Sequence, residues 1–455
     1  MFQPVIFREY DIRGVYNTDF DDNFAELLGR AYVVYMKEQK GVSNPNVVLG
    51  HDARSSCGNI IKSLAKGITE SGGNVIHIGL VTSPVCYFAT FTVAGVDGAI
   101  QVTGSHNPPE YNGFKVSVGK ATIFGEEIQK LRHIMEKGQF LNGQGKESKH
   151  DIFPAYLARY KEEFGQLKDV KIVLDCGNGA GGVVARGLFN AVGLNPTILF
   201  EKPDGTFPNH HPDPTVEKNL VDLAAQVKKE GAVCGIGFDG DADRIGVVDQ
   251  TGKMLYGDEL MVIYSRSILA TQKGAKIVGD VKCSDRMYHD IEQHGGVPIM
   301  WKTGHSLVKE KIKAEKAPFG GEMSGHIFFA DRNYGYDDAP YAALRLVEIL
   351  SKTGKTIPEL LAGLPSAFNT PEIRIDTTEE KKLLIVQKMI EAFGKGGADF
   401  TANLTDGIRL SFNDGWALCR SSNTQPVLVV RYESTTQAGL DRIRNRVEEV
   451  VNKYL

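Results

Sequence analysis

The fold is decided by the stretch Val170-Lys-Ile-Val-Leu-Asp-Cys-Gly-Asn-Gly-Ala-Gly-Gly182 and the residues that follow it. The β-branched start of this stretch is typical of a strand, and the glycines that follow are typical of a tight turn. Residues 183–192 then have the apolar spacing of a helix, and residues 197–200 have the composition of a second strand. A strand, a helix and a strand in this order predict a βαβ unit with parallel strands.

The same order of elements occurs twice more in the chain. The two further series are 47–50, 59–71 and 75–78, and 276–279, 286–294 and 298–301. The three series begin about 105 to 125 residues apart, which predicts three related α/β domains in tandem.

The C-terminal part of the chain has a different pattern. Its helical and strand-like segments are, in chain order, 379–394, 407–411, 416–419, 427–432 and 437–453. Strands enclosed by two helices predict an α+β domain rather than another βαβ unit. We therefore expect four domains, at residues 1–150, 151–253, 254–367 and 368–455.

Composition argues against several classes of protein. Of the 455 residues, 42% are hydrophobic and 24% are charged, as in soluble globular proteins. Lys plus Arg number 52 against 56 Asp plus Glu, so the basic excess of a nucleic-acid-binding protein is missing. No apolar run approaches the ~20 residues that cross a bilayer, and the first residues do not resemble a signal peptide. Six cysteines without a Cys-x-x-Cys pair favour reduced thiols, so we expect a cytoplasmic protein with no nucleic-acid or membrane partner.

Glycine is unusually frequent. The chain has 50 glycines, about 11% against a usual ~7%, and no collagen-like or low-complexity repeat accounts for them. They indicate turns and places where the backbone approaches another group closely. Each predicted α/β unit has one glycine-rich loop after a strand, where open α/β sheets usually bind ligands. These loops are 100–108, 235–244 and 319–326.

The strongest functional signal is the loop Asp239-Gly-Asp241-Ala-Asp243-Arg244. Three carboxylates at alternate positions can converge on one cation if the loop curls, and oxygen ligands favour Mg²⁺, Ca²⁺ or Mn²⁺. An EF-hand does not fit, because Arg244 and Gln250 stand where its loop needs Gly and Glu. A solvated acidic turn is the alternative, but like charges beside the apolar run 245–248 would be costly without a cation. We therefore expect a metal site.

A second candidate site is Thr103-Gly-Ser-His-Asn-Pro-Pro109. Ser105 lies between glycine and histidine, and two prolines stiffen the exit, as suits an exposed and rigidly held nucleophile. A turn whose serine and asparagine cap local backbone groups is the alternative. The segment is not the Gly-x-Ser-x-Gly elbow of α/β-hydrolases, so an esterase has little support. Lys115, ten residues on, is a surface lysine unless a reactive group lies near it.

Two more segments have the composition of anion-binding sites. Arg420-Ser-Ser-Asn-Thr-Gln-Pro426 offers hydroxyls, an amide and a guanidinium in one tight turn, which can satisfy the oxygens of a phosphate. A capped turn explains this segment almost equally well. Arg8-Glu-Tyr-Asp-Ile-Arg-Gly14 places two arginines beside a glycine, which is a weaker signal.

One motif favours a different function. Gly177-Asn-Gly-Ala-Gly-Gly182 follows a predicted strand and opens a helix, and Glu201 closes the next strand, as in a dinucleotide-binding fold. An NAD-dependent enzyme is therefore an alternative. It would explain neither the carboxylate loop nor the loop of Ser105.

Taken in chain order, the motifs resemble the α-D-phosphohexomutase superfamily, most closely the bacterial phosphomannomutase/phosphoglucomutase group. The matching segments are Tyr10-Asp-Ile-Arg-Gly14, Thr103-Gly-Ser-His-Asn-Pro108, Asp239-Gly-Asp-Ala-Asp-Arg244, Lys302-Thr-Gly-His305, Gly321-Glu-Met-Ser-Gly-His326 and Arg420-Ser-Ser-Asn-Thr424. The likeness spans almost the whole chain, and the joint order and spacing are highly specific. The resemblance implies three α/β domains with mixed sheets and a C-terminal α+β domain around a central cleft.

The resemblance also implies an activity. It is the reversible interconversion of hexose 1-phosphate and hexose 6-phosphate, of mannose or glucose or both, by an intramolecular phosphotransferase. Ser105 would carry the phosphoryl group, and the reaction would pass through a hexose 1,6-bisphosphate that also serves as activator. One Mg²⁺ would be bound by Asp239, Asp241, Asp243 and a phosphoryl oxygen on Ser105. The partners would be hexose phosphates, and the protein would be a monomer or weak dimer.

The same resemblance implies residue roles around the substrate. Catalysis would use Ser105, His106, Lys115, Arg244 and His326. Sugar and phosphate would be bound by Tyr10, Arg13, Lys282, His305, Glu322, Ser324 and His326. The phosphate that is not transferred would be held by Arg420, Ser421, Ser422, Asn423 and Thr424.

Several groups are candidates for moving the proton. Lys115 is the first candidate for general acid and base, since burial beside other cations would lower its pKa. His106 would support it, and His326 or His305 would be placed to assist. Mg²⁺, Lys115 and Arg244 would neutralise charge on the transferred group. A C-terminal domain hinged around residues 366–371 would give the bisphosphate room to turn over.

Some features depart from the family or leave alternatives open. Gly104 stands where the family's serine loop often has alanine, and a residue this small keeps room for the phosphate. The sugar loop at 321–325 disfavours a mutase for N-acetylglucosamine phosphate. A binding-only regulator is a further alternative, although nucleophile, metal ligands and sugar loop are all present. The preferred sugar, the pathway and the identity of the general acid and base stay open.

Overall fold

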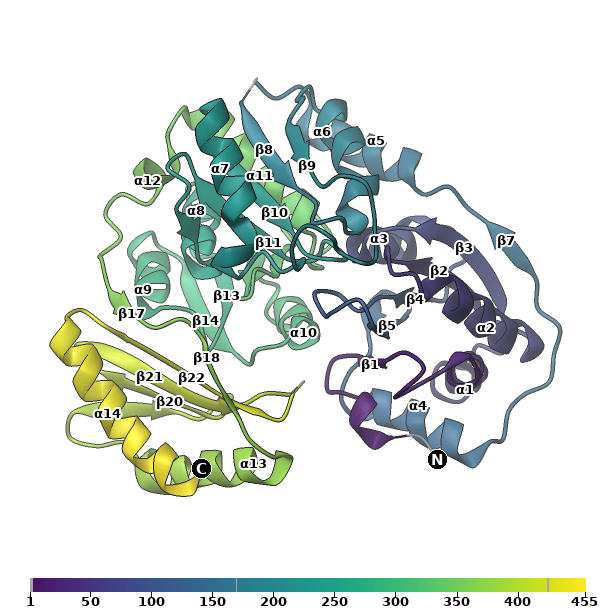
Figure 1. Cartoon of the computed structure of the whole chain (residues 1–455). Coiled ribbons are helices and arrows are strands. Elements are labelled where there is room, and N and C mark those ends of the chain that lie inside the picture. Colours follow the sequence, from purple (N-terminus) through teal and green to yellow (C-terminus); the bar gives the residue numbers. More distant parts are fainter. Residues whose placement is uncertain (1–2, 169, 424) are drawn as a thin grey trace. The chain divides into compact units, whose positions relative to one another are not determined.

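The computed structural model describes residues 3–168, 170–423 and 425–455 of the chain (Figure 1). These residues form two compact units. The first unit comprises residues 1–257, 324–329 and 336–360, and the second comprises 258–323, 330–335 and 361–455. The predicted succession of mixed α/β sheets followed by a C-terminal α+β domain is confirmed.

The first sheet of the first unit has the strand order β1-β5-β4-β2-β3-β7, with β6 paired to β5. Its strands are β1 (Ile12–Val15), β2 (Asn46–His51), β3 (Asn74–Leu80), β4 (Gly98–Val102), β5 (Tyr111–Val118), β6 (Ala121–Thr122) and β7 (Glu147–Lys149). Strand β2 is parallel to β3 and β4, whereas β4 and β5 are antiparallel. Because His51 lies opposite Val102, the segments that follow β2 and β4 leave the sheet side by side.

The helices of this part pack against the sheet through an apolar core. They are α1 (Asp22–Lys40), α2 (Cys57–Glu70), α3 (Ser83–Thr92) and α4 (Glu126–Lys137). Helix α1 packs along α2, and this close approach depends on glycine, since a Cβ on Gly67 would lie 1.9 Å from the carbonyl oxygen of Glu26. Buried side chains of α1, α2, α4 and the sheet form one continuous cluster.

The second sheet of the first unit has the order β12-β11-β10-β8-β9. Its strands are β8 (Ile172–Asp175), β9 (Thr197–Leu199), β10 (Cys234–Phe238), β11 (Ile245–Asp249) and β12 (Met254–Leu255). Strand β8 is parallel to β9 and β10, and β10 forms an antiparallel hairpin with β11. The associated helices are α5 (Phe153–Phe164), α6 (Ala185–Ala191) and α7 (Val221–Glu230).

Some elements within residues 254–367 belong to the first compact unit. Strand β16 (Ile327–Phe329) and helix α11 (Ala339–Thr353) belong to the first unit, where α11 contacts β10 and β11. The hydroxyls of Tyr156 and Tyr160 on α5 donate to Asp338, which caps the start of α11. These buried polar contacts attach the start of α11 to α5, and sequence periodicity does not reveal them.

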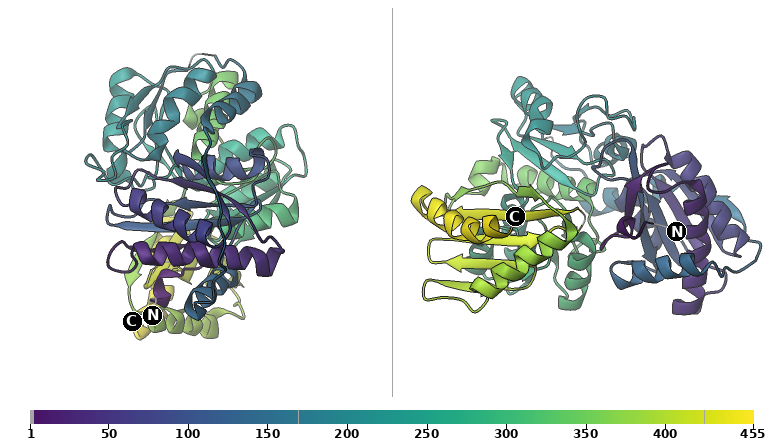
Figure 2. Two further views of the ribbon diagram at one scale, coloured as in Figure 1. Left: turned by 90° about the vertical axis from the view of Figure 1, so that its right-hand side faces the viewer. Right: turned by 60° about the horizontal axis from the view of Figure 1, so that its bottom comes forward.

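The second unit contains a parallel sheet and the C-terminal domain. Its parallel strands are β13 (Lys276–Asp280), β14 (Val297–Trp301) and β15 (Phe319–Gly321), with helices α8 (Gly257–Leu269), α9 (Asp285–Gln293) and α10 (His305–Glu315). The C-terminal strands are β17 (Phe368–Asn369), β18 (Ile373–Asp376), β19 (Phe400–Asn403), β20 (Ile408–Phe412), β21 (Gly415–Ser421) and β22 (Val427–Ser434). Helices α13 (Glu379–Phe393) and α14 (Gln437–Tyr454) lie side by side against this sheet (Figure 2).

Two expectations from composition can be compared with the fold. All six cysteines are free and buried, and burial raises the pKa of thiols such as Cys234 and Cys419 to about 12. Among the described residues, no helix is long and apolar enough to cross a membrane.

Candidate active site

The carboxylate loop connects β10 to β11 and is curled by its own backbone contacts. The carboxylate of Asp239 accepts hydrogen bonds from the N–H groups of Asp243 (3.0 Å) and Arg244 (3.1 Å). Ala242 adopts a φ of +57°, in the left-handed region that side chains other than glycine rarely occupy. As a result, one oxygen from each of Asp239, Asp241 and Asp243 lies within 4.8 Å of the others.

This carboxylate cluster could hold a metal ion. All three aspartates are buried, and in the described part of the chain Oδ1 of Asp241 and Oδ1 of Asp243 accept no hydrogen bond. Burial and the charges of Asp241 and Asp243 raise the pKa of Asp239 well above its ordinary value. A divalent cation would offset this repulsion and satisfy the two oxygens, so the residues present fit an oxygen-ligated ion.

Ser105 meets this cluster from the loop that follows β4. Its Oγ donates to Oδ2 of Asp239 (2.8 Å) and lies 3.2 Å from Nδ1 of His106. The serine is buried and has a φ of +49°. At Gly240 the two loops touch, because a Cβ there would lie 2.3 Å from the carbonyl oxygen of Ser105. The structure thus brings the expected nucleophile and the expected metal ligands together.

Lys115, on β5, joins the same cluster. Its ammonium group lies 2.6 Å from Oδ2 of Asp241 and also contacts Asp243. Burial tends to lower the pKa of Lys115, but the two carboxylates outweigh burial and raise it well above its ordinary value. The expectation that neighbouring cations lower this pKa was therefore wrong, because the groups that face Lys115 are carboxylates. Ser83, at the start of α3, also donates to Asp241 and was missed in the sequence.

Arg244 and His326 form a pair beside the carboxylates. Nε of Arg244 donates to Nε2 of His326 (3.0 Å). The other ring nitrogen of His326 lies 3.0 Å from Asp337 and 3.6 Å from Asp243. Asp243, His326 and Asp337 form a second group whose atoms could hold a metal ion. Asp337 was not predicted, and only its place in the acidic pair Asp337-Asp338 could have indicated it.

The remaining expected residues of the first unit lie near its N-terminus and in the sugar loop. Tyr10 is buried, and the guanidinium of Arg13 on β1 is paired with Asp11. Burial, Arg244 and Arg13 lower the pKa of His106 well below its ordinary value. Ser324 belongs to this unit, whereas Glu322 of the same motif belongs to the second unit.

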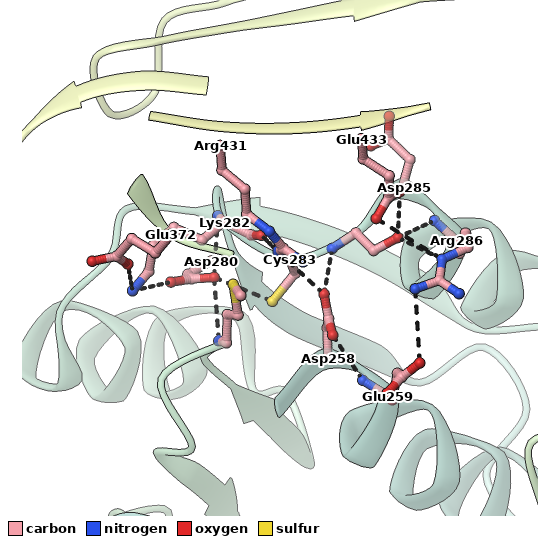
Figure 3. A network of polar contacts seen from close by, with 12 residues as sticks. Asp258, Glu259, Asp280, Lys282, Cys283, Asp285, Arg286, Glu372, Arg431 and Glu433 are labelled. Atoms are coloured by element: carbon pink, nitrogen blue, oxygen red, sulfur yellow. Dashed lines mark hydrogen bonds and ion pairs between the residues drawn. The ribbon is translucent and has the colours of Figure 1, made fainter. Parts of the chain in front are cut away.

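Lys282 lies in the second unit, just after β13 (Figure 3). Its side chain is almost fully buried, and its ammonium lies 3.2 Å from Glu372 and 3.8 Å from Asp280. Burial tends to lower the pKa of Lys282, but Glu372, Asp280 and Glu322 outweigh it and raise the pKa. The acidic partners Asp280 and Glu372 were not predicted.

Arg420 is joined to the same region by a chain of hydrogen bonds. Its Nε donates to Asp406 (3.0 Å), which also accepts the N–H of Thr303 (3.0 Å). The hydroxyl of Thr303 donates to Asp280 (3.0 Å), the last residue of β13. Residues 281–284, which follow it and precede α9, are called the Lys282 loop below. Glu322 accepts the N–H of Gly304, which precedes the buried His305 at the start of α10.

The rest of the expected phosphate loop lies at the end of β21. Ser421 is the last residue of that strand, and the N–H of Ser422 donates to Val427 (3.0 Å). Lys382 on α13 donates to the carbonyl of Ser422 (2.6 Å) and was not predicted. Asn423 follows Ser422, and Thr424 lies outside the described residues.

Two buried arginines of the C-terminal sheet bind the backbone of the Lys282 loop. Arg409 on β20 donates to the carbonyls of Val281 and Cys283. Arg431 on β22 donates to the carbonyl of Lys282, and Figure 3 shows these two residues side by side. Trp416 lies against both guanidinium groups, with the central carbon of Arg409 3.7 Å from the ring centre. A charged residue inside an apolar strand was the only sequence signal for these arginines.

The glycine motif that favoured a dinucleotide site has a different use. A Cβ on Gly179 would lie 2.7 Å from the carbonyl oxygen of Gly240, and one on Gly182 would lie 1.8 Å from that of Glu201. The carboxylate of Glu201 is paired with Arg186 (2.5 Å). Gly179 therefore allows close packing against the carboxylate loop, Gly182 allows close packing against the backbone of Glu201, and the side chain of Glu201 is paired with Arg186.

Comparison with known proteins covers the whole length of the chain. Family models match in order, namely phosphoglucomutase/phosphomannomutase alpha/beta/alpha domain I at residues 4–142, domain II at 154–252, domain III at 256–368 and the C-terminal domain at 372–450. A phosphomannomutase/phosphoglucomutase of Pseudomonas aeruginosa is 42% identical, covering 96% of this chain and 94% of that protein. A phosphoglucomutase of Neisseria gonorrhoeae is 41% identical, covering 98% and 96%. The crystal structure of a family protein from Burkholderia thailandensis superposes with a TM-score of 0.92 at 39% identity, covering 100% and 98%.

Proposed function

Because the chain belongs to the phosphoglucomutase/phosphomannomutase family, we propose that it is an intramolecular phosphotransferase that interconverts hexose 1-phosphates and hexose 6-phosphates. The sugar is glucose, mannose or both, in keeping with the names of its relatives. One observation carries the proposal, which is the buried Ser105 hydroxyl 2.8 Å from Asp239 within the carboxylate cluster. A serine held in this way is placed for phosphoryl transfer rather than for hydride transfer.

The proposed cycle has two halves. In the first, a free hydroxyl of the hexose phosphate attacks phosphorus on phospho-Ser105, and the bond from phosphorus to Oγ breaks as the new ester bond forms. The proton of the attacking hydroxyl passes to a base, and Oγ takes up a proton. The resulting hexose 1,6-bisphosphate turns over and returns its other phosphoryl group to Ser105 by the same chemistry in reverse.

Three groups are the candidates for moving these protons. His106 has a ring nitrogen 3.2 Å from Oγ of Ser105. His326 is oriented by Arg244 on one ring nitrogen and has Asp337 beside the other. Lys115 presents its ammonium group to Asp241 and Asp243 in the same cluster. Arg244 and Lys115 supply positive charge beside the transferred group.

We assign Mg²⁺ to the carboxylate cluster, with Asp239, Asp241, Asp243 and a phosphoryl oxygen on Ser105 as ligands. The support is the hard-oxygen donor set and the two buried Oδ1 atoms described above. When bound, the ion would withdraw charge from the phosphoryl group. Hexose 1,6-bisphosphate would restore the phosphoserine whenever it is lost and so act as activator.

The second unit supplies some of the groups proposed to bind sugar phosphate. Lys282, Glu322 and Arg420 interact electrostatically there, which supports a role for them at one end of the substrate. The remaining residues proposed for sugar and phosphate are Tyr10, Arg13, His305, Ser324, His326, Ser421, Ser422, Asn423 and Thr424. The hinge at residues 366–371, the cytoplasmic location and the monomeric or weakly dimeric state stay predictions.

One assay tests the proposed function. Glucose 1-phosphate, mannose 1-phosphate and N-acetylglucosamine 1-phosphate are compared with Mg²⁺ and trace glucose 1,6-bisphosphate, and we expect conversion of the first two only. Asp241→Asn should lose metal affinity and activity together, whereas Asp204→Asn, an exposed residue of the same domain, should change neither. Full activity in chelator would contradict the metal assignment, and a saturable thermal stabilisation by NAD would favour a dehydrogenase.

A further inference from the structure

Arg54 is a buried arginine that the mechanism above does not use. It lies just after β2, and its side chain has no exposed surface. A guanidinium group stays charged in proteins and has five N–H donors, so its burial is tolerated only where those donors find acceptors. The place of those acceptors indicates what the residue does.

The acceptors of Arg54 are almost all carbonyls of the loop that carries Ser105. Nε donates to the carboxylate of Asp52 (3.1 Å). The other two nitrogens donate to the carbonyl oxygens of Ser105 (2.9 Å), Asn107 (2.6 Å), Pro108 and Tyr111 (2.9 Å). One side chain therefore binds the loop at four points between Ser105 and the start of β5.

Asp52 binds the other end of the same loop. Its Oδ2 accepts from the hydroxyl of Thr103 (2.7 Å) and the N–H of Gly104 (3.2 Å), and its Oδ1 accepts from the N–H of Arg54 (2.9 Å). The two residues before Ser105 and the residues after it are thus fixed to one ion pair. Because β2 and β4 lie side by side in the sheet, this pair stands directly beside the loop.

The backbone at Ser105 needs such support. Its φ of +49° is unfavourable for serine, and such a conformation persists only where the surroundings hold it in place. The N–H of Ser105 donates to Thr103 Oγ (2.8 Å) and its carbonyl accepts from Arg54, so both flanking peptide groups are held. This conformation is the one that directs Oγ to Asp239.

Neighbouring residues leave space for the guanidinium and close it off from solvent. A Cβ on Gly104 would lie 2.5 Å from the central carbon of Arg54, so the space beside Gly104 is filled by this arginine. The ring of Phe207 lies 5.1 Å from the same guanidinium group. A Cβ on Gly205 would lie 2.5 Å from the carbonyl of Ala53, which shows how closely this segment covers the site.

We propose that Arg54 is a positioning residue that holds Ser105 in its left-handed conformation and so sets the direction in which phospho-Ser105 faces its acceptor. This proposal rests on the proposed function, since it gives Arg54 a part in phosphoryl transfer. The planar fork of arginine matters, because a lysine has one nitrogen and cannot reach four separated carbonyls. A misplacement of about 1 Å at a reacting atom can lower a rate about a hundredfold.

Two variants separate positioning from stability. Arg54→Lys keeps the charge and loses the fork, and Arg54→Met removes both. We expect kcat to fall about thirtyfold or more in Arg54→Lys, with KM for hexose phosphate within about twofold of wild type. The rate at which glucose 1,6-bisphosphate phosphorylates Ser105 should fall by a similar factor.

The matched control is Arg345→Lys. Arg345, on α11, is a buried arginine of the same unit that packs against the rings of Phe329 and Tyr341. This variant should lose stability and keep kcat when assayed below its melting temperature. If Arg54→Lys behaves in the same way, or if only KM changes, the proposal is wrong. Should Arg54→Met not fold, Arg54→Lys decides the question.

A crystal structure of the Arg54 variants tests the proposal independently of the reaction. We expect Ser105 to leave its positive φ and Oγ to move out of hydrogen-bond distance from Asp239. An unchanged Ser105 in Arg54→Lys or Arg54→Met would overturn the positioning role. If instead the wild-type protein shows no mutase activity while the variants still displace Ser105, the proposed function fails and the structural role of Arg54 stands.

Discussion

Two functional loops of this protein are held by buried arginines, but the arginines come from different places. The Ser105 loop is bound by Arg54, which lies 51 residues earlier in the chain at the end of the neighbouring strand of the same sheet. The Lys282 loop is bound by Arg409 and Arg431 of the C-terminal sheet, through bonds that span 126 and 149 residues. The first loop is therefore fixed within its own domain, and the second is fixed by another domain.

This difference separates the residues that position the nucleophile from the residues proposed to bind the substrate. Arg409, Arg420 and Arg431 lie on the adjacent strands β20, β21 and β22, so a movement of that sheet displaces the backbone of Lys282 and the guanidinium of Arg420 together. The nucleophile has no such dependence, because the contacts of Arg54 are made within the first unit. We expect changes around Arg54 to alter kcat and changes around Arg409 and Arg431 to alter KM.

The largest effect should follow removal of the nucleophile itself. Ser105→Ala should lower kcat at least about a thousandfold, because a reaction through a phosphoserine has no other acceptor on the protein. Binding of hexose phosphate, measured by calorimetry, should stay within about threefold of wild type. Ser55→Ala, an exposed serine near the same sheet edge, is the control. Turnover above a tenth of wild type would place the chemistry elsewhere.

Trp416→Ala should disrupt the second region most strongly. The ring is fully buried against two guanidinium groups, and its Nε1 donates to Glu433 (3.0 Å). Loss of a buried aromatic ring lowers the free energy of unfolding by about 3–5 kcal/mol, measured by urea denaturation. Phe368→Ala, on an exposed ring of the same unit, should cost less than about 1 kcal/mol. Equal losses in both variants would contradict the role of Trp416.

Glu372→Gln tests the ion pair of Lys282 through its pH dependence. Although burial opposes it, Lys282 and Arg374 lower the pKa of Glu372 to about 2. A carboxylate with a lowered pKa stabilises the fold above its unfolded-state pKa near 4.5, and this stability is lost as the pH falls toward 2. About a quarter of the Glu372 side chain is exposed, so solvent screening reduces this stabilisation. We expect the free energy of unfolding of wild type to exceed that of Glu372→Gln by about 2 kcal/mol at pH 7.

The difference in the free energy of unfolding between wild type and Glu372→Gln should shrink steadily below pH 4.5, as measured by urea denaturation at several pH values. Glu379→Gln is the control, since Glu379 is half exposed and paired with Lys382. A difference that is independent of pH would show that the charge of Glu372 is not the stabilising feature.

The smallest effect expected is that of Arg409→Lys. A lysine cannot bind the carbonyls of Val281 and Cys283 at once, so the loop of Lys282 should loosen. We expect KM for hexose phosphate to rise about tenfold while kcat stays within about twofold, which is the reverse of Arg54→Lys. Arg444→Lys, on the exposed face of α14, should change neither. A fall in kcat at constant KM would remove the distinction between the two loops.

The local part of this architecture could be predicted from the sequence. The βαβ series are visible because period-two and helical spacing occur within short windows, and Asp239, Asp241 and Asp243 are separated by single small residues. Their convergence in the structure depends on contacts inside the same loop, such as Asp239 with Asp243 and Arg244. The contacts that curl this loop therefore lie within the motif itself, so the sequence of the motif is enough to predict the site.

The remainder depends on contacts between distant segments. Lys115 meets Asp241 and Asp243 across 126 and 128 residues, so its environment could not be derived from its own segment, and the expected direction of its pKa was wrong. Arg54 lies in an unremarkable Asp-Ala-Arg segment, and only the neighbouring strand order shows that it faces the Ser105 loop. The packing of α11 within the first unit likewise depends on a contact between distant segments, the hydrogen bond from Tyr160 to Asp338.

The central claim is that Ser105 carries the phosphoryl group, and mass spectrometry of its peptide tests that claim most directly. After exposure to glucose 1,6-bisphosphate, the peptide containing Ser105 should carry one phosphoryl group, and incubation with hexose 6-phosphate should remove it. If the peptide is never phosphorylated under these conditions while the protein remains folded, the claim is contradicted.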